Sequence, residues 1–289
     1  MAHLIQRVTV LGTGLIGGSF ALALREFTPD IEIAGWDRGE IVREAHSRGA
    51  IQNAFFGELG PAIVNADLIY IALPISATID LLPEIARHAS PRALITDACS
   101  TKLRITQASA EFFDPGTGPL FLGGHPMAGR ELSGIKQADA ELFRNTTYAL
   151  IGASGEEHDP RINAFVKILE KIGARALWLG AQQHDDAVGM ASHLPQLAAV
   201  ALGSFLYDHL DENGLPITLA GPGLRDSLRL AGSSYATWRD IVLTNREVLS
   251  AALDLYARRL DDLRERLGSR ELEADFDAAN ELYKLLRSM

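Results

Sequence analysis

The stretch that decides the fold is residues 8–19, which have the sequence VTVLGTGLIGGS. It begins as an apolar, β-branched strand and continues into a helical pattern over residues 15–27. Between them Gly12, Gly14 and Gly17 form a Gly-x-Gly-x-x-Gly motif. In this context Gly12 permits a tight turn, Gly14 lets the backbone approach a pyrophosphate, and Gly17 lets the helix pack on the strand. The stretch therefore predicts dinucleotide binding, with a purely structural glycine turn as the alternative.

An acidic residue at the expected distance indicates which dinucleotide is bound. Asp37 comes twenty residues after Gly17, at the end of the second predicted strand. A carboxylate there accepts hydrogen bonds from both ribose hydroxyls and repels a 2′-phosphate, which favours NAD. Arg38 keeps NADP open as the alternative, because a guanidinium can hold a 2′-phosphate. We expect the cofactor site to contain Gly12, Gly14, Leu15, Ile16, Gly17, Asp37, Arg38, Pro74 and Ser100.

Strands and helices alternate up to Gly180, after which strand patterns almost vanish. The strands are apolar on both faces, which is typical of a mostly parallel, doubly wound α/β sheet covered by helices. We therefore expect a dinucleotide-binding domain over residues 1–180 and an all-helical domain over residues 181–289. The predicted strands are residues 7–11, 31–36, 68–73, 93–96, 120–122, 147–151 and 175–179. The predicted helices of the first domain are residues 15–27, 40–48, 76–88, 101–113 and 159–172.

One apolar stripe in the second half has a clear helical period. Its residues follow one another at spacings of 4, 3, 4, 3 and 4. The stripe predicts a helix that packs on another helix, either within the core of its own domain or across a dimer interface. The residues of the stripe are Leu249, Leu253, Tyr256, Leu260, Leu263 and Leu267.

Composition excludes several classes of protein. The 27 Lys and Arg against 37 Asp and Glu give a net charge of −10, which argues against nucleic acid or an anionic membrane as a partner. Cys99 is the one cysteine, so no internal disulfide forms. We expect no signal peptide, because the first residues lack a charged head, a long apolar core and a small-residue cleavage site, and no apolar run reaches the roughly 20 residues of a membrane-spanning helix. We expect a cytoplasmic protein.

Several motifs resemble those of the prephenate and arogenate dehydrogenases of tyrosine biosynthesis, in order from about residue 7 to residue 245. This resemblance implies a Rossmann domain followed by a helical domain through which two chains form a homodimer. The motifs are GTGLIGGS at residues 12–19, DACSTK at 97–102, GGHPMAG at 123–129, SHLP at 192–195, GLRDSLRLA at 223–231 and WRDI at 238–241.

His125 is the candidate proton acceptor. It follows a short predicted strand and two glycines at the carboxyl edge of the sheet, where such folds bind ligands, and imidazole accepts a proton near neutral pH. The residues alone leave open a structural histidine in a turn, and the resemblance favours the catalytic role. Ser100 matches the family serine between nicotinamide and substrate hydroxyl, and its sequence position also fits an N-cap for a helix beginning at Thr101.

The resemblance also implies the substrate-binding residues. Arg229 matches the family arginine that binds the side-chain carboxylate of the substrate. A guanidinium can donate two parallel hydrogen bonds to one carboxylate. Ser192 and His193 are implied to lie near the substrate or the domain interface. Gln196 departs from the commonest family pattern, which has a second histidine there. Glu131, Asp226 and Trp238, with Arg229, are implied to form a gate at the pocket mouth, partly donated by the neighbouring subunit; Asp226 and Arg229 also have the spacing of a simple helical ion pair.

The implied reaction is the NAD-dependent oxidative decarboxylation of prephenate to 4-hydroxyphenylpyruvate, carbon dioxide and NADH. Residues 232–235 offer no carboxylate for the ammonium of arogenate, which favours prephenate; an arogenate or dual-specificity cyclohexadienyl dehydrogenase is the alternative. A β-hydroxyacid dehydrogenase and a non-catalytic NAD-sensing protein are more remote. We expect no metal, because His184 and His193 are half a turn out of phase on one helix.

Overall fold

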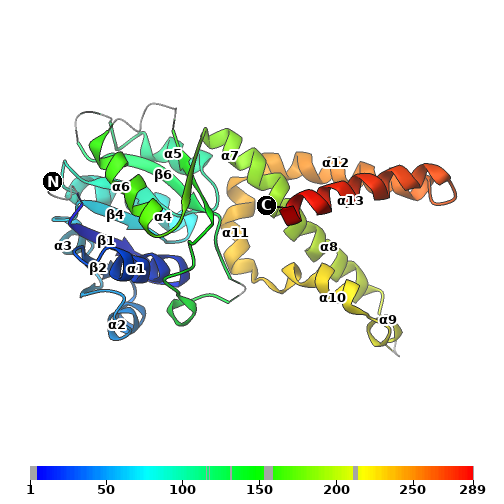
Figure 1. Ribbon diagram of the computed structural model, residues 1–289, viewed down its shortest axis with the longest axis horizontal. Helices are drawn as coiled ribbons and strands as arrows, with labels where there is room; N and C mark the ends of the chain where they lie inside the picture. The colour runs from blue at the N-terminus through cyan, green and yellow to red at the C-terminus, as the bar shows by residue number, and fades with distance from the viewer. Residues whose placement is uncertain are drawn as a thin grey trace.

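The computed structural model describes residues 5–114, 116, 118–130, 132–152, 159–210 and 214–288. Figure 1 shows an α/β unit followed by a group of helices that extends away from it. Glu131, expected in the gate, lies outside the described residues. In the described part of the chain, no helix combines the length and the apolar character needed to cross a membrane.

Eight strands of the described residues form one sheet in the order β3-β2-β1-β4-β5-β6-β7-β8. All neighbours run parallel except β6 and β7, which are antiparallel. This order over β1 to β6 is that of a Rossmann fold, so the expected doubly wound sheet is confirmed. The strands are β1 Arg7–Leu11, β2 Glu32–Trp36, β3 Asn53–Phe55, β4 Leu68–Ile71, β5 Leu94–Asp97, β6 Leu120–Pro126, β7 Thr147–Ile151 and β8 Arg175–Leu179.

Helices cover both faces of the sheet, which is why its central strands are apolar throughout. In β4, Tyr70 faces α1, where it stacks on Phe20 with ring centroids 3.9 Å apart, whereas Ile69 and Ile71 face α3 and α4. The helices are α1 Leu15–Phe27, α2 Gly39–Ser47, α3 Gly60–Ile63, α4 Ile75–His88, α5 Leu103–Ser109 and α6 Pro160–Lys171.

Four details of this half differ from the sequence prediction. The short β3 and α3 were not predicted, because three or four residues carry no readable period. Strand β6 continues four residues past the predicted end at 122, so His125 lies within the strand and not after it. Helix α5 begins at Leu103 and not at residue 101, with Lys102 at the N-cap, so the predicted capping role of Ser100 is wrong.

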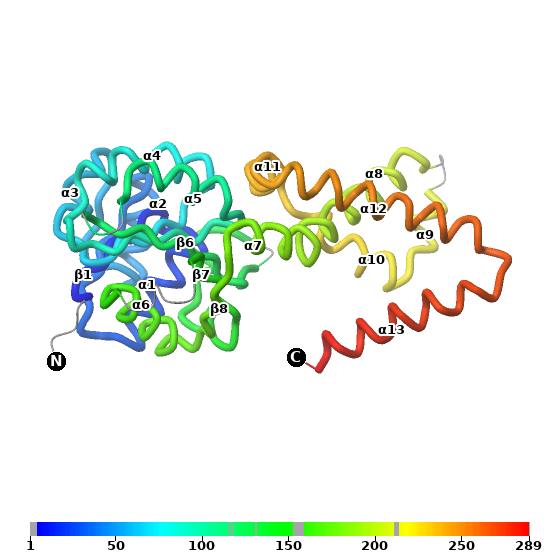
Figure 2. The backbone as a smooth tube through the Cα atoms, turned by 90° about the horizontal axis from the view of Figure 1, so that it is seen from above, coloured from blue at the N-terminus to red at the C-terminus, as the bar shows by residue number. Residues whose placement is uncertain are grey.

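The second half is helical in every described element. Helices α7 and α8 are joined by a π-helical turn at Gly189–His193. Figure 2 shows α12 and α13 diverging from a shared bend. The helices are α7 Ala181–Val188, α8 Leu194–Asp208, α9 Leu215–Thr218, α10 Pro222–Leu228, α11 Tyr235–Thr244, α12 Arg246–Glu265 and α13 Glu273–Ser288.

The apolar stripe lies on α12 and continues just past its end. Leu249 is buried, but the stripe becomes exposed along the helix, reaching 50% at Leu260 and 72% at Leu267. No described residue of α13 is buried, although Phe276 and Leu286 are large and apolar. A helix in the core of its own domain would bury this stripe. The exposure of the stripe is therefore not explained by the first alternative, a core helix, and favours the second, a dimer interface.

The glycine turn between β1 and α1 is tightly packed on one side only. Gly12 has φ +90°, and a Cβ there would lie 2.4 Å from the carbonyl oxygen of Ala72. A Cβ on Gly17 would lie 1.9 Å from the carbonyl oxygen of Gly12, whereas a Cβ on Gly14 would meet nothing within 4 Å. Gly12 and Gly17 are therefore required by packing, and Gly14 borders open space.

These contacts predict different outcomes for two alanine variants. Gly17→Ala is expected to lower the free energy of unfolding by more than about 3 kcal/mol, because backbone must move to admit the methyl group. Gly14→Ala is the matched control and is expected to stay within about 1 kcal/mol of the parent protein. Urea unfolding of both variants measures this, and equal stabilities would contradict the packing argument.

Candidate active site

The glycine turn leads into the N-terminus of α1 at the carboxyl edge of the sheet. Leu15 and Ile16 open the helix, and among the described residues no side chain caps its N-terminus. The unpaired N–H groups and the positive end of the helix dipole make this a site for a phosphate. The open space at Gly14 lets an anion come close to the backbone. The geometry fits the pyrophosphate of a dinucleotide.

Asp37 follows β2 and lies beside this turn. Its Oδ2 accepts a hydrogen bond of 2.8 Å from the backbone N–H of Thr13, and its Oδ1 accepts one of 2.7 Å from the backbone N–H of Arg38. Oδ2 also accepts a longer hydrogen bond of 3.4 Å from the Thr13 hydroxyl, and Oδ1 keeps a further lone pair that can accept from a ribose hydroxyl. The Arg38 side chain is exposed, and Pro74 precedes α4 at the carboxyl end of β4.

Ser100 and His125 lie at the same edge, because β5 and β6 are parallel neighbours that end there. Both side chains are half-buried. The preceding Gly124 permits the close approach of the two strand ends: a Cβ there would lie 2.7 Å from the carbonyl oxygen of Asp97. The structure thus brings the two predicted catalytic residues to the edge that holds the phosphate site.

A fully buried ion pair lies under this edge. The Lys102 ammonium contacts the Asp97 carboxylate and donates a hydrogen bond of 2.6 Å to the carbonyl oxygen of Gly124. Asp97 also accepts from the backbone N–H groups of Cys99, at 3.0 Å, and Gly124, at 3.2 Å. Because each charge has several partners, its loss of hydration is compensated. The pair ties β5, the start of α5 and β6 together directly behind His125.

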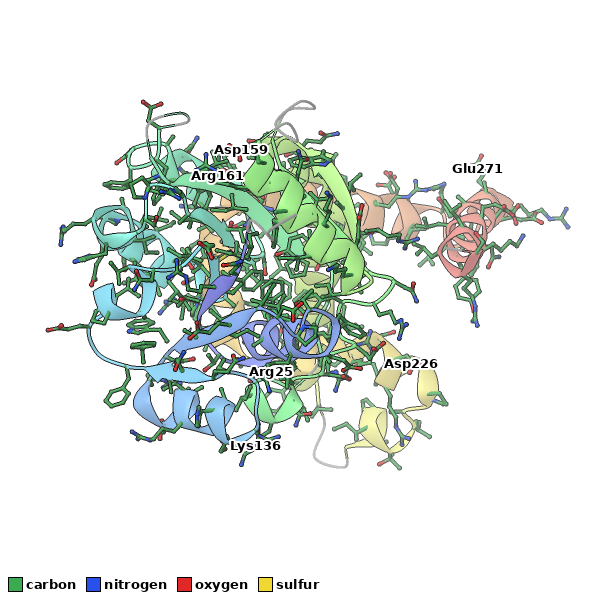
Figure 3. The ribbon with its side chains drawn as sticks, turned by 60° about the vertical axis from the view of Figure 1, so that its left-hand side comes forward. Arg25, Lys136, Asp159, Arg161, Asp226 and Glu271 are labelled. Carbon is green, nitrogen blue, oxygen red and sulfur yellow. The ribbon has the colours of Figure 1, made fainter. Side chains whose placement is uncertain are left out.

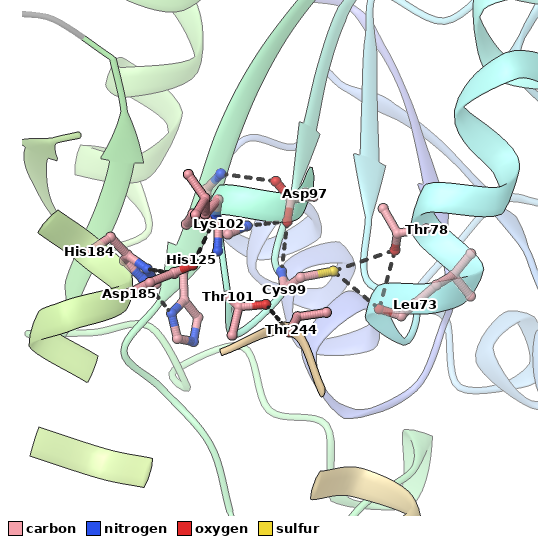
Figure 4. Close-up of polar contacts among 12 residues, drawn as sticks. Leu73, Thr78, Asp97, Cys99, Thr101, Lys102, His125, His184, Asp185 and Thr244 are labelled. Carbon is pink, nitrogen blue, oxygen red and sulfur yellow. Dashed lines mark hydrogen bonds and ion pairs between the residues drawn. The ribbon is translucent and has the colours of Figure 1, made fainter. Parts of the chain in front are cut away.

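His125 is also linked to the helical half of the chain (Figure 4). Its Nδ1 lies 2.9 Å from Nε2 of His184, whose Nδ1 lies 2.8 Å from Oδ1 of Asp185. The Asp185 carboxylate accepts the backbone N–H groups of Lys102, at 2.7 Å, and Leu103, at 2.9 Å. Asp185 on α7 therefore caps α5, which is the role that the sequence analysis had considered for Ser100.

His193 lies on the far side of the same cluster. Asn245 donates Nδ2–H to the carbonyl oxygen of Asp185, at 2.9 Å, and lies 3.2 Å from Nδ1 of His193. Since an amide nitrogen only donates, Nδ1 of His193 accepts and its proton is on Nε2. The His193 ring makes an edge contact with Trp238 of α11, with centroids 5.6 Å apart. Ser192, its neighbour, is exposed.

Three other predicted residues lie further into the helical half. Gln196 is buried and donates Nε2–H to the carbonyl oxygen of Leu230, at 2.9 Å, so it fastens α8 to the segment after α10. Asp226 and Arg229 are exposed in and just after α10. Figure 3 places Asp226 on the outer part of the helical half, and Figure 1 places α10 beyond α11 as seen from the sheet. Within one chain they are not part of the His125 cluster.

The electrostatic surroundings decide which groups can take a proton. Burial, together with the neighbouring His184 ring and the Lys102 ammonium, holds the pKa of His125 well below the usual 6.5. Burial likewise lowers the pKa of His193 to about 4. Burial raises the pKa of the Cys99 thiol to about 12, so it is not a thiolate nucleophile. His125 is thus a neutral imidazole, ready to accept a proton.

The argument against a metal site assumed an uninterrupted helix between His184 and His193. The π-helical turn at Gly189–His193 changes that phase, so the argument from helical phase was wrong, and the two rings flank one cluster. Both nitrogens of His184 are engaged, by Asp185 and His125, and Nδ1 of His193 is engaged by Asn245. Over the described ranges, no three His, Cys, Asp or Glu side chains are grouped to hold a metal ion.

Sequence reasoning assigned no role to Asp97, Lys102, His184, Asp185 or Asn245. Asp97 and Lys102 lie in a quoted motif, and a charged pair at the end of a buried strand was the available signal. His184 entered the sequence prediction only in the argument about a metal site. Nothing in the sequence pairs Asp185 with residues 82 or 83 positions away.

Two family models match the chain. The model described as prephenate dehydrogenase, nucleotide-binding domain, matches residues 20–178, and the one described as prephenate dehydrogenase, dimerization domain, matches residues 180–287. A curated relative, the prephenate dehydrogenase of Lactococcus lactis subsp. cremoris, is 35% identical over 271 residues, which cover 93% of this chain and 73% of the relative.

Solved structures agree with this similarity. The prephenate dehydrogenase from A. aeolicus in complex with hydroxyphenyl propionate and NAD+ superimposes with a TM-score of 0.87 at 26% identity, covering 98% of each chain. The Synechocystis arogenate dehydrogenase superimposes with a TM-score of 0.75 at 28% identity, covering 98% of this chain and 96% of that one.

The buried ion pair predicts a large effect from one substitution. Lys102→Met leaves the Asp97 charge buried without its cation and is expected to lower the free energy of unfolding by about 3 to 5 kcal/mol. Lys284→Met is the matched control, because it removes an exposed lysine paired with Glu281 on α13, and it is expected to change stability by less than about 0.5 kcal/mol. Urea unfolding compares them; a Lys102 variant as stable as the control would refute the role of the pair.

Proposed function

Because the chain belongs to the prephenate dehydrogenase family, we propose that it oxidatively decarboxylates prephenate with NAD, giving 4-hydroxyphenylpyruvate, carbon dioxide and NADH. The observation that carries the proposal is the neutral His125 at the sheet edge, beside Ser100 and the phosphate site. Its Nδ1 is engaged by His184, which leaves Nε2 for a substrate hydroxyl.

The cofactor is held by the residues around the glycine turn. Gly12, Gly14 and Gly17 with the start of α1, at Leu15 and Ile16, receive the pyrophosphate, and Asp37 receives the ribose hydroxyls. Arg38, Pro74 and Ser100 complete the proposed site. When bound, NAD supplies the hydride acceptor. The oriented Asp37 carboxylate supports NAD over NADP, because it repels a 2′-phosphate.

His125 carries a second proton, on Nε2, only during the reaction. As the C4–H hydride leaves the substrate, Nε2 of His125 takes the proton of the C4 hydroxyl and a carbonyl forms. Loss of carbon dioxide then sends an electron pair through the ring to that oxygen, which recovers the proton from His125 as the ring becomes aromatic. No net proton is released, so the base returns to its neutral form in each cycle. Ser100 orients the hydroxyl and His125.

The carboxylates of the substrate need cations and hydrogen-bond donors. We assign Arg229 to the side-chain carboxylate and His193, which carries its proton on Nε2, to a donor role. Ser192, Gln196 and Trp238 complete the substrate site. Glu131, Asp226 and Arg229 form the gate, and some of these residues come from a second subunit. This is supported by α10, which lies away from the sheet of its own chain.

We further infer a homodimer through the helical domain. The family model for this region is described as a dimerization domain, and α12 and α13 expose large apolar side chains that their own chain does not cover. We divide the chain into the dinucleotide-binding domain, residues 1–180, and the helical substrate and dimerisation domain, residues 181–289. We place the protein in the cytoplasm, where NAD and a single reduced cysteine are expected.

A steady-state assay tests the activity. Purified protein is expected to form NADH, followed by its absorbance, with prephenate and NAD, and to be slower with arogenate or NADP. His125→Asn is expected to lower kcat by about 10²-fold or more. A faster reaction with arogenate or NADP would overturn the substrate or cofactor assignment.

The pH profile has an expected sign. His125 must be unprotonated to accept a proton, and its pKa is lowered, so kcat/KM should stay level as the pH falls to 6.5 and decline only below it. An acidic limb centred at or above pH 6.5 would show that His125 is not the base, or not in this environment.

The dimer makes a prediction of its own. Leu260→Glu places a charge on the apolar stripe of α12 and is expected to shift the protein from dimer to monomer in sedimentation velocity. Val64→Glu is the control, because Val64 is equally exposed, at 50%, but lies in the other domain. A Leu260 variant with the mass of the parent dimer would contradict the interface.

A further inference from the structure

We propose that His184 is a positioning residue that fixes which ring nitrogen of His125 carries the proton, so that His125 presents an unprotonated Nε2 to the substrate. The proposal rests on the proposed function only in taking His125 as the base. It is carried by an unbroken chain of contacts, from His125 Nδ1 to His184 Nε2 at 2.9 Å and from His184 Nδ1 to Asp185 Oδ1 at 2.8 Å.

The chain of contacts has one consistent set of protons when both rings are neutral. An ionised carboxylate only accepts, so Nδ1 of His184 carries a proton and donates it to Asp185. The neutral His184 ring then has a lone pair on Nε2, and Nδ1 of His125 must be the donor in their contact. The remaining nitrogen of His125, Nε2, is therefore the acceptor.

The contacts of Asp185 fix the position of its carboxylate, and this position determines which nitrogens of His184 and His125 carry protons. Its two oxygens accept the first N–H groups of α5, from Lys102 and Leu103, and its carbonyl oxygen accepts from Asn245. His184 and Asp185 are each only 1% exposed, so water does not compete for their polar atoms. The orientation of the His184 ring is thereby fixed from both halves of the chain.

A doubly protonated His184 is the alternative, and it would reverse the outcome. Its Nε2–H would donate to Nδ1 of His125, whose proton would then be on Nε2, and His125 would have no acceptor for the substrate. The charged groups facing the pair are the Lys102 ammonium and the Asp185 carboxylate, and the neutral His193 ring is the other titratable group near them. Only the neutral His184 ring, which accepts at Nε2 from Nδ1 of His125, is consistent with His125 as the base.

During the reaction the same contacts support the transient positive charge. When Nε2 of His125 accepts the substrate proton, its Nδ1–H donates from a cation to His184, and the charge-assisted bond is stronger than the neutral one. The proton on His184 remains directed at Asp185. His184 thus acts only through His125 and contacts no reacting atom.

Nuclear magnetic resonance of the full-length protein tests the tautomer without any activity measurement. With ¹⁵N-labelled histidines, we expect the His125 ring, identified by its absence in His125→Asn, to be neutral and protonated at Nδ1. Protonation at Nε2 alone, or at both nitrogens, at neutral pH would overturn the proposal. If the protein failed to oxidise prephenate, the proposed function would fall while this measurement still decided the tautomer.

Two variants of His184 separate orientation from mere packing. Gln places an amide near Nε2 and can still accept from His125, whereas Asn places its amide near Nδ1, toward Asp185, and offers His125 nothing. We expect His184→Asn to lower kcat by about 10²-fold or more with the KM for NAD unchanged, and to lose the Nδ1–H signal of His125. We expect His184→Gln to keep the signal and to retain kcat within about tenfold.

Equal kcat values and equal tautomers in His184→Asn and the parent protein would refute the proposal. A purely structural role would instead lower the stability of both variants without a difference between them in the tautomer of His125, and this too would refute it. If the Asn variant does not fold, the tautomer in the parent protein and in His184→Gln decides the question.

Discussion

The carboxylate of Asp185 lies between the two halves of the chain and serves both. It belongs to α7, yet it accepts the first N–H groups of α5 and thereby replaces a local N-cap with one from the other domain. On its own helix it accepts a hydrogen bond from Nδ1–H of His184, whose ring contacts His125. One carboxylate thus sets the approach of α7 to the sheet and the orientation of the His184 ring beside His125.

The buried charges nearby give this arrangement its rigidity. Lys102 has no exposed surface, and its ammonium is satisfied only when β5, α5 and the carbonyl oxygen of Gly124 are all in place. Such a pair contributes little net stability against an apolar core, but an alternative local packing would leave a charge without partners. The backbone on which His125 lies is therefore specified by electrostatics, at a position where the missing side chain of Gly124 makes room.

The sequence predicted the Rossmann half well because its signals are local. The motif at Gly12 and the acid at Asp37 depend on spacings within one βαβ unit, and apolar runs mark the central strands. It missed β3 and α3, which are too short to show a period. It also missed the π-helical turn, so the phases of residues on either side of it were wrong. His125 was predicted, but its link to His184 joins residues 59 positions apart that no local pattern connects.

The domain interface also determines where an anion can bind along the sheet edge. Helices α1, α4 and α5 follow β1, β4 and β5, and each directs its positive end toward that edge. Asp240 of α11 accepts the N–H and hydroxyl of Ser76 in the first turn of α4, at 2.9 and 2.6 Å. Asp185 accepts two backbone N–H groups at the start of α5. Two of these three electropositive ends are therefore neutralised by carboxylates of the protein itself. Over the described ranges no side chain caps α1, so of these three helix ends α1 is the one that the helical half leaves open to a diphosphate.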